Sequence, residues 1–321
     1  MLPREVVMRP DATGTPPLLR TTQVLIMVIG SSRFRHKSER AFRTWCRSPR
    51  GVRCLFFSDA DAGDASAGMG DEAALPMVTI GDAEPPSGCC SPRSRRNGFF
   101  CAAHRKRTLR AQYRFLPALE YVRSSAAFAS AAFQWILLVD DDSFVFVPRL
   151  LWILQRLDPS HPLYAGDFGS SGEATALRIP HFSCGGGGSL LSAEALRRMD
   201  VSVCLRRYRS RCMQSDWMIG GCARYHNVSE LRTLGCGTCD AKRLAEPRYR
   251  AVVRAKLREE RCYFLQNAEV FARELPLGLH SAAVVHGLRD AEQAAFFRKH
   301  NATYRLHSPT RTTTSRPALH F

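Results

Sequence analysis

Three consecutive aspartates, Asp140, Asp141 and Asp142, are the residues of this sequence best suited to chemistry. The residues before them, 136–139, are apolar without alternation, which predicts a strand buried on both faces of a parallel sheet. Ligands bind at the carboxyl ends of such strands in open α/β sheets. Neighbouring carboxylates repel one another, so we expect a cation to stabilise them in preference to a solvated acidic turn. Oxygen ligands suit a hard divalent ion such as Mg²⁺ or Mn²⁺, shared with a phosphate.

Asp216 and His286 are two further candidate site residues. Asp216 stands at the start of an expected helix, where the helix dipole favours a carboxylate. His286 ends an apolar strand expected at 282–285, and imidazole is a suitable ligand for Mn²⁺. A histidine at a strand end is often only exposed, and His280 is a nearby rival for the same role.

A run of glycines is another candidate part of a ligand site. It consists of Gly185, Gly186, Gly187 and Gly188. Glycine lets the backbone approach a ligand closely or adopt a positive φ. A mobile linker has the same composition, so the run alone leaves both interpretations open.

Basic side chains precede the carboxylate strand. Arg107, Arg110 and Arg114 could reach a nucleotide phosphate, although a solvated basic face is the simpler explanation of each. Cys236 and Cys239 lack the second pair of ligands that a zinc site needs, which leaves a redox role or a local disulfide open.

Strands and helices are expected to alternate along the chain. Strands are expected at 23–29, 53–57, 136–139, 163–165, 189–191 and 282–285, and helices at 38–46, 105–122, from Pro148 onward, at 193–199 and at 216–225. Ser192 and Ser215 are suitable N-caps for the last two helices. Pro117 should kink or break its helix. The alternation predicts an α/β fold with a mostly parallel central sheet flanked by helices.

The chain is expected to form a single domain over residues 21–307. Residues 1–20 should be disordered and 308–321 should form a flexible tail. Loop insertions are expected at about 81–104 and 227–261, where Pro, Gly, Cys and basic residues interrupt the pattern.

The composition is that of a globular protein with a strong basic excess. The 46 Lys and Arg residues outnumber 29 Asp and Glu residues, giving a net charge of +17. Such a charge suits nucleic acid, a membrane surface or a polyanionic substrate. The arginines are spread along the chain, no common nucleic-acid-binding module is recognised, and a GC-rich coding genome also produces high Arg and Ala.

Cysteine content favours an oxidising compartment. Twelve cysteines and the sequons Asn227-Val-Ser229 and Asn301-Ala-Thr303 are typical of a secreted or luminal protein. No apolar segment reaches the ~18 residues of a membrane span, and the N-terminus has no signal-peptide core. Any membrane anchor is therefore expected outside this sequence, either because the chain is truncated or because the anchor comes from elsewhere.

An ordered set of segments resembles the fringe-like family of inverting β-1,3-glycosyltransferases. The segments are Val24–Ser32, Arg43–Trp45, Phe56–Asp59, Asp140–Asp142, Cys184–Gly188 and Ser215–Ile219. The similarity is greatest to the plant-type members, whose pattern includes Phe-Gly-Gly-Gly-Gly and Cys…Ser-Asp-Asp-x-x-Ile-x-x-Cys. Here these read Ser183-Cys-Gly-Gly-Gly-Gly188 and Cys204…Ser215-Asp-Trp-Met-Ile-Gly-Gly-Cys222, with Ser215 where an acid normally precedes the base.

The resemblance implies a GT-A-like fold and a role for each site residue. Asp142 would be the direct metal ligand, joined by His286, while Asp140 and Asp141 would contact the metal shell or the nucleotide ribose. Asp216 would be the catalytic base, and Gly185–Gly188 would line the sugar. A disulfide between Cys204 and Cys222 would hold the base segment.

The resemblance also implies the reaction and its setting. A hexose or N-acetylhexosamine would pass from a UDP-sugar to a hydroxyl of a glycan or glycoprotein, with Mn²⁺ or another divalent cation. A β-1,3 linkage and a location in the Golgi lumen would follow, with no specific nucleic-acid partner.

Two other functions fit parts of the same sequence. A haloacid-dehalogenase-type phosphatase also has Asp-x-Asp after a buried strand, but Asp140–Phe144 fits its pattern poorly and no later Lys and Asp pair is clear. A non-enzymatic polyanion-binding protein, or an inactive relative of the family, is the other alternative. UDP affinity that requires Mn²⁺ would distinguish the transferase from both.

Overall fold

The computed structural model describes residues 23–46, 52–59, 75–80, 112–126, 133–208, 210–259, 261–271 and 282–287. All of them belong to one compact unit, Met1–Gly287. The expected insertion at 81–104, the flexible ends, and Arg107, Arg110 and His280 lie outside the described residues.

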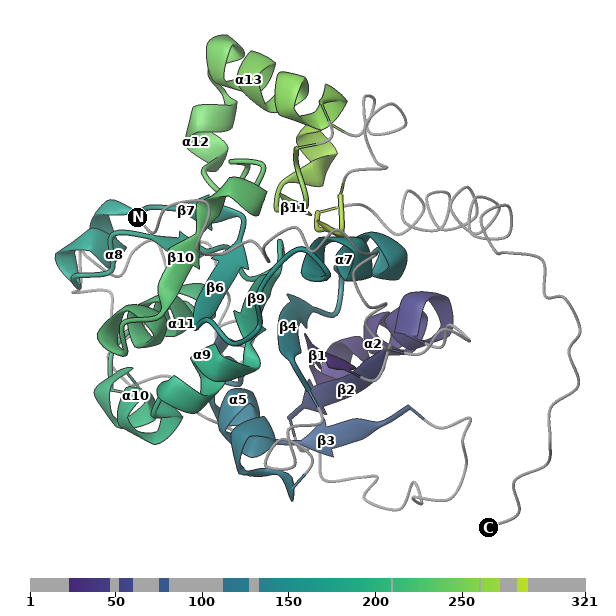
Figure 1. The fold of residues 1–321 in the computed structure, drawn as a ribbon, viewed down its shortest axis with the longest axis vertical. Coiled ribbons are helices and arrows are strands. Elements are labelled where there is room, and N and C mark those ends of the chain that lie inside the picture. Colours follow the sequence, from purple (N-terminus) through teal and green to yellow (C-terminus); the bar gives the residue numbers. More distant parts are fainter. Residues whose placement is uncertain are drawn as a thin grey trace, which may run out of the picture. The chain divides into compact units, whose positions relative to one another are not determined.

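A seven-stranded sheet forms the centre of the fold (Figure 1). Its strands are β1 (Val24–Ile29), β2 (Arg53–Ser58), β3 (Met77–Thr79), β4 (Trp135–Asp140), β6 (Leu163–Gly166), β9 (Ser189–Ser192) and β10 (Ser229–Leu231), in the order β10-β6-β9-β4-β1-β2-β3. The strand β9 runs antiparallel to both β4 and β6, whereas the other neighbouring pairs are parallel. The predicted mostly parallel sheet is confirmed.

The central strands are buried on both faces, as their apolar runs predicted. Every residue of β1 is buried, and so are residues 135–139 of β4. The two strands lie side by side in parallel, with Ile29 opposite Asp140. Both strands therefore deliver their carboxyl ends, and the polar residues that follow, to the same edge of the sheet.

Helices cover both faces of this sheet. On one face, α5 (Phe115–Ser124), α9 (Ala193–Arg198), α10 (Val201–Tyr208) and α11 (Ser215–Tyr225) enclose the main apolar core. Leu25, Met27 and Leu138 supply the strand side of that core. On the opposite face, Phe42 packs edge-on against Phe56, with ring centroids 6.1 Å apart.

Two small sheets lie beyond the carboxyl edge of the large one. The first contains β5 (Phe144–Val145), β11 (Phe264–Leu265) and β12 (Val284–Val285), in the order β11-β12-β5. The second pairs β7 (Phe168–Gly169) with β8 (Phe182–Ser183). Because β5 and β12 are antiparallel, the residues before β5 lie next to those after β12. This pairing brings the aspartate run close to His286.

Helix boundaries differ from the expected ones at several positions. The helix expected from residue 38 begins at Arg35 as α2 (Arg35–Ala41), after a 3-10 turn (Ser32–Phe34), and continues as a π-helical turn (Phe42–Cys46). Gln112 is helical, a turn follows at 113–114, and α5 begins at Phe115, so the helix is interrupted just before Pro117 as one of the two expected outcomes; residues 105–111 lie outside the described residues. A proline in the first turn leaves no hydrogen bond broken.

The two predicted N-caps have different outcomes. Ser192 caps α9, since its side chain accepts a hydrogen bond from the Ala195 backbone at 3.0 Å. Ser215 is instead the first residue of α11, and its hydroxyl contacts Gln112 at 2.6 Å. The N-cap residue of α11 is Gln214, and its side chain forms no capping hydrogen bond.

The remaining helices lie around the small sheets. They are α7 (Val147–Leu154), with proline in its first turn as expected, α8 (Gly172–Ala176), α12 (Ala241–Leu244), α13 (Pro247–Arg258) and two 3-10 turns (Arg232–Leu234 and Ala268–Phe271). The helices α12 and α13 lie at the top of Figure 1, beyond β7 and β11. No helix within the described ranges is long and apolar enough to cross a lipid bilayer.

Candidate active site

The aspartate run lies at the carboxyl edge of the large sheet. Asp140 is the last residue of β4, and Asp141 and Asp142 form the turn that follows. The Asp141 backbone N–H donates to the Ile29 carbonyl at 3.2 Å, which fastens this turn to β1. The Asp141 side chain lies next to Gly30, where a Cβ would be only 2.9 Å from a carboxylate oxygen. A glycine there lets the two chains approach.

Asp142 is held between two cationic side chains. Its Oδ2 accepts a hydrogen bond from Lys37 Nζ at 2.9 Å, and its Oδ1 lies 3.1 Å from His286 Nε2. These partners come from α2 and from the end of β12. Three distant segments therefore meet at this carboxylate.

The ligand atoms of Asp140, Asp142 and His286 all lie within 4.8 Å of one another. Two carboxylates and one imidazole form a donor set that suits Mn²⁺. The predicted metal ligands, Asp142 and His286, are thus brought together. Asp140 completes the group, whereas Asp141 is directed toward β1.

The surroundings of the three aspartates move their pKa values in different directions. Burial, followed by the negative charge of Asp142, raises the pKa of Asp140 to about 6. Burial and the charges of both neighbours raise the pKa of Asp141 to about 7. Burial also acts to raise the pKa of Asp142, but hydrogen bonds and positive charges from His286 and Lys37 outweigh it and hold this pKa well below its usual range.

His286 is oriented by the backbone of Gln266. Burial alone would lower the pKa of His286, but its hydrogen bond to Asp142 and the charges of Asp142 and Asp140 raise it to about 9. The Nδ1–H group donates to the Gln266 carbonyl at 3.1 Å. That contact leaves Nε2 directed at Asp142, the orientation that a cation ligand requires.

The glycine run is a packed turn between β8 and β9. Ser143 Oγ donates to the Gly186 carbonyl at 2.7 Å, and the Gly187 backbone donates to the Gln266 side chain. A Cβ on Gly186 would lie 2.4 Å from the His286 ring, and Gly188 has a φ of 89°. These contacts exclude the linker interpretation.

Asp216 is a buried carboxylate in the first turn of α11. It is 7% exposed, and its Oδ1 accepts from the Trp217 backbone at 2.9 Å. Burial is the main cause that raises its pKa to about 7, the charge of Asp140 adds to this, and backbone hydrogen bonds from Trp217 and Gly185 act in the opposite direction. The charge of Asp140 and the hydrogen bond from Gly185 connect Asp216 to the aspartate run and to the glycine turn.

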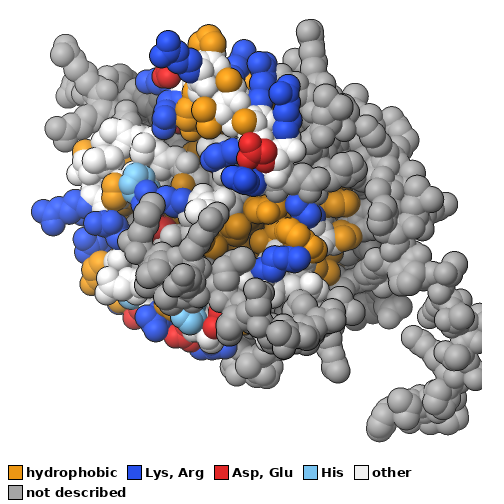
Figure 2. Space-filling model, turned by 45° about the horizontal axis from the view of Figure 1, so that its top comes forward, with side chains coloured by type: hydrophobic (Ala, Val, Ile, Leu, Met, Phe, Trp, Pro, Cys, Tyr) orange, Lys and Arg blue, Asp and Glu red, His pale blue; other side chains and the backbone are white. Residues whose placement is uncertain are grey.

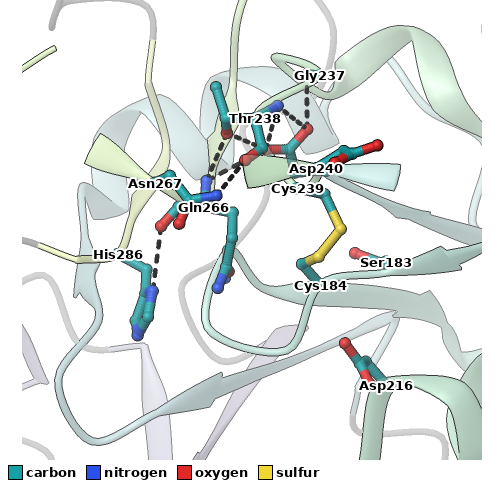
Figure 3. The surroundings of a disulfide bond; sticks show 12 residues. Ser183, Cys184, Asp216, Gly237, Thr238, Cys239, Asp240, Gln266, Asn267 and His286 are labelled. Carbon is teal, nitrogen blue, oxygen red and sulfur yellow. Dashed lines mark hydrogen bonds between the residues drawn. A yellow bond between two sulfur atoms is a disulfide. The ribbon is translucent and has the colours of Figure 1, made fainter. Parts of the chain in front are cut away.

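A second buried carboxylate, Asp167, forms hydrogen bonds with the loops next to His286. It has no exposed surface and accepts from the backbones of Gly237 at 2.6 Å and Gln266 at 3.1 Å, and from the Thr238 hydroxyl. Gln266 also donates to the Thr238 hydroxyl at 2.8 Å. Figure 3 shows these loops meeting above His286. Asp167 therefore fixes the segment that orients His286.

Disulfides tie the same loops together. Cys184, next to the glycine turn, is bonded to Cys239 (Figure 3). Cys236 is bonded to Cys262. The two cysteines of the Cys236–Cys239 segment thus pair with distant partners and form no local bridge. The implied bridge between Cys204 and Cys222 is confirmed, and a fourth joins Cys46 to Cys54.

Arg114 has neither of the roles considered from sequence. It is 1% exposed and forms a 2.6 Å ion pair with Asp59, while it also donates to the Gly30 carbonyl. A buried guanidinium needs such partners. Arg114 therefore joins the carboxyl ends of β1 and β2, and it is not a solvated basic residue.

Sequence reasoning missed Lys37, Asp167, Thr238 and Gln266. Asp167 directly follows β6, so the rule that functional side chains follow strands would have selected it. Lys37 could have been considered because it lies in the first turn of α2, the helix that follows β1. Thr238 and Gln266 give no signal in the sequence.

The fold and the site define a class of protein. A mostly parallel sheet flanked by helices, with Asp140, Asp142 and His286 gathered beyond its central strand, is an α/β domain whose side chains could hold a metal ion. The family model described as Fringe-like matches residues 19–225, well over half of the chain. The chain belongs to the Fringe-like family.

Curated relatives match a shorter part of the chain. The chain is 35% identical over 89 residues to a beta-1,3-glucosyltransferase of Mus musculus. The matched residues make up 28% of this chain and 17% of that protein. The chain is also 32% identical over 99 residues to chondroitin sulfate synthase 3 of Mus musculus, covering 29% and 11%. The match therefore spans less than a fifth of either relative's length.

One solved structure aligns along most of the chain. It is a galactosyltransferase, LgtC, in complex with donor and acceptor sugar analogs. The alignment covers 87% of this chain and 95% of that one, with a TM-score of 0.42 and 13% identity.

Proposed function

We propose that this protein is an inverting glycosyltransferase that forms a β-1,3 linkage. It transfers a hexose or N-acetylhexosamine from a UDP-sugar to a hydroxyl of a glycan or glycoprotein. The observation that carries the proposal is the convergence of Asp140, Asp142 and His286 at the carboxyl edge of the sheet. Membership of the Fringe-like family and the name of the matched glucosyltransferase support it.

Asp142, His286 and Asp140 would hold Mn²⁺ or another divalent cation. Such a cation supplies Lewis-acid stabilisation of a diphosphate leaving group. Coordination through His286 requires Nε2 without its proton, and the Gln266 carbonyl keeps Nδ1 as the protonated nitrogen. The carboxylate of Asp142, which contacts Lys37 and His286, would supply an oxygen ligand to the cation.

Asp216 accepts the proton of the attacking hydroxyl. The acceptor oxygen forms a bond to the anomeric carbon while the bond from that carbon to the diphosphate breaks, and the electron pair leaves with UDP. Inversion places this base on the face opposite the leaving group. The glycine turn lies between His286 and α11, with Gly186 beside the imidazole and Gly185 near the Ser215 hydroxyl.

An oxidising compartment of the secretory pathway fits this function. Four disulfides within the described residues support it, because such bonds persist in oxidising compartments. We place the protein in the Golgi lumen.

The alternatives have less support. A haloacid-dehalogenase-type phosphatase would need Asp140 as its nucleophile, and the Asp140–Phe144 segment fits the pattern of that class poorly. The Fringe-like match favours the transferase as well. A polyanion-binding protein or an inactive relative would not release UDP.

Calorimetry with UDP in the presence and absence of Mn²⁺ tests the proposal, followed by a screen of UDP-sugars for UDP release. Wild-type protein should bind UDP only with the cation. Asp142→Ala should weaken this affinity on the order of a hundredfold, because a carboxylate ligand is lost. Asp200→Ala, which removes an exposed carboxylate before α10, is the control and should leave it unchanged. Cation-independent binding by the wild type would disprove the metal role.

A further inference from the structure

The turn after α11 contains an Asn-x-Ser triplet whose last residue begins β10. The triplet is Asn227-Val228-Ser229. Asn227 is exposed, Val228 is buried and Ser229 is half-buried. Such a triplet is the acceptor for N-linked glycosylation, which requires the asparagine to lie at the surface. Asn227 meets this requirement in the folded domain, whereas the second triplet, at 301–303, lies outside the described residues.

The backbone of the turn explains the asparagine but not the serine. Asn227 has a φ of 55°, in the left-handed region that Asn adopts more readily than other residues with a side chain. Its N–H donates to the Arg224 carbonyl at 3.1 Å, and the Val228 N–H donates to the Ala223 carbonyl at 2.9 Å. These hydrogen bonds use backbone atoms alone. They therefore give no reason for a hydroxyl at Ser229.

The polar side chains of the triplet have no structural role within the described residues. Neither the Asn227 amide nor the Ser229 hydroxyl forms a hydrogen bond there, although the Ser229 backbone N–H donates to the Pro162 carbonyl at 2.8 Å. Because Asn227 is exposed and its amide is not engaged, a bulky group on Nδ2 breaks no contact of the fold.

The surface around Asn227 has two features that a glycan would cover. Among the described strands, β10 lies at the edge of the large sheet and pairs with β6 alone. An open edge strand favours unwanted pairing with another chain. Tyr225, two residues before Asn227, is 50% exposed, and its ring offers apolar surface to the C–H groups of a sugar. An oligosaccharide on Asn227 would shield both features from solvent.

Basic side chains next to Tyr225 do not distinguish this region as an anion site. Arg207 lies over the Tyr225 ring, with its Cζ 4.9 Å from the ring centroid, and Arg224 is exposed. Figure 2 shows Lys and Arg side chains over much of the face that it draws, so basic groups are common on the surface. The Asn-x-Ser triplet is the distinctive feature of this region.

A glycan at Asn227 would leave the candidate active site open. Asp216 lies in the first turn of α11, and Asn227 follows the other end of this helix. A helix of eleven residues is about 16 Å long. Modification of Asn227 should therefore leave the affinity for UDP unchanged.

We propose that Asn227 carries an N-linked oligosaccharide. The inference rests on the proposed location in the secretory pathway, which the four disulfides support. The co-reactant is a lipid-linked oligosaccharide diphosphate, used by the oligosaccharide transferase of that pathway. Asn227 Nδ2 forms a bond to the anomeric carbon of the first sugar while the bond from that carbon to the diphosphate breaks. The electron pair leaves with the diphosphate, and the amide loses one proton to the transferase.

Mass spectrometry of one tryptic peptide tests this proposal. A cleavable signal peptide directs the full chain into the secretory pathway of a eukaryotic cell. Trypsin then releases residues 225–232, whose one asparagine is Asn227. An N-glycanase in H₂¹⁸O converts a glycosylated asparagine to labelled aspartate. The wild type and Ser229→Thr, which keeps the hydroxyl, should both become labelled, whereas Ser229→Ala should lower the labelling about tenfold or more.

The disulfide between Cys204 and Cys222 shows that the chain has folded in an oxidising compartment. Unlabelled Asn227 in protein that holds this disulfide overturns the inference. Equal labelling of Ser229→Ala and the wild type overturns it as well. The same peptide is examined in protein from its natural source, where absence of the label has the same consequence.

The Mn²⁺-linked affinity for UDP is measured on the same samples, before and after removal of the glycan. It tests the proposed function separately, since Asn227 is not part of the candidate active site. If UDP binds normally and Asn227 is unlabelled, this inference fails and the proposed function stands. If Asn227 is labelled and UDP does not bind, the proposed function fails and the glycosylation site stands.

Discussion

Asp142 and Asp216 are identical side chains whose surroundings move their pKa values in opposite directions. Contacts with His286 and Lys37 keep Asp142 ionised, so it is available to a cation at every physiological pH. Burial raises the pKa of Asp216 to about 7, which is suited to a group that accepts a proton and releases it again. At the residue scale, the two environments suit the proposed roles, in which Asp142 binds a cation and Asp216 accepts a proton.

The pH dependence of turnover should report Asp216. A base acts only when deprotonated, and its pKa is about 7. Turnover should therefore be low at pH 5.5, rise through pH 7 and level off above it. Initial rates of UDP release at saturating donor and cation measure this profile. A flat profile from pH 6 to 8 would contradict the assignment.

Asp216→Asn is the matched variant for this profile. The amide keeps the shape of the side chain but cannot accept the proton, so turnover should fall by roughly 10² to 10⁴. Because Asp216 is not among the cation ligands, the affinity for UDP with Mn²⁺ should stay within about twofold of the wild type. Near-normal turnover in this variant would show that Asp216 is not the base.

At the scale of elements, the glycine turn and the small sheet position the site together. The β5–β12 pairing places His286 beside Asp142. The turn then packs on the imidazole through Gly186 and on Gln266 through Gly187. The imidazole thus has a turn on one side and a backbone carbonyl on Nδ1, which leaves little freedom for its ring.

Gly186→Ala should displace His286. The added Cβ would lie 2.4 Å from the imidazole, well inside van der Waals contact, so the ring must move. The Mn²⁺-linked affinity for UDP should fall by about ten- to a hundredfold, as for other changes that disturb the orientation of a ligand. Calorimetry measures this change.

Gly172→Ala is the control for that substitution. A Cβ at Gly172 has nothing within 4 Å, and the residue lies in α8. Its UDP affinity should equal that of the wild type. If both alanine variants bind UDP as the wild type does, the glycine turn does not position His286.

At the scale of the whole molecule, disulfides join segments that the sheet leaves apart. Cys184–Cys239 closes a separation of 55 residues and Cys46–Cys54 one of only 8. The longer loop loses more entropy in the unfolded chain when it is cross-linked. The first bridge also borders the site, whereas the second joins the end of the π-helical turn to β2.

Replacing each pair by serine should separate the two contributions. Cys184→Ser with Cys239→Ser should lower the free energy of unfolding by about 1.7 kcal/mol more than Cys46→Ser with Cys54→Ser, from loop lengths alone. Chemical denaturation measures both. The first variant should also weaken Mn²⁺-linked UDP binding, and the second should not. Equal UDP affinity in the two variants would exclude a role for Cys184–Cys239 at the site.

The buried strands and the acidic edge of the sheet are determined by the sequence itself. Apolar runs without alternation in β1 and β4 can be accommodated only between two layers of helices. The polar residues that end these strands must then lie at one edge, because the strands are parallel. Asp140 and Asp142 were found in this way, whereas Asp216, in the first turn of α11, was found through the resemblance to a family.

Only the tertiary structure decided how the site is assembled. The ion pair of Lys37 and Asp142 spans 105 residues, and Gln266 orients His286 from 20 residues away. Ser215 has the right type for an N-cap, yet its hydroxyl is engaged by Gln112, 103 residues away. Such contacts depend on where packed elements bring side chains together, and periodicity along the chain carries no information about that.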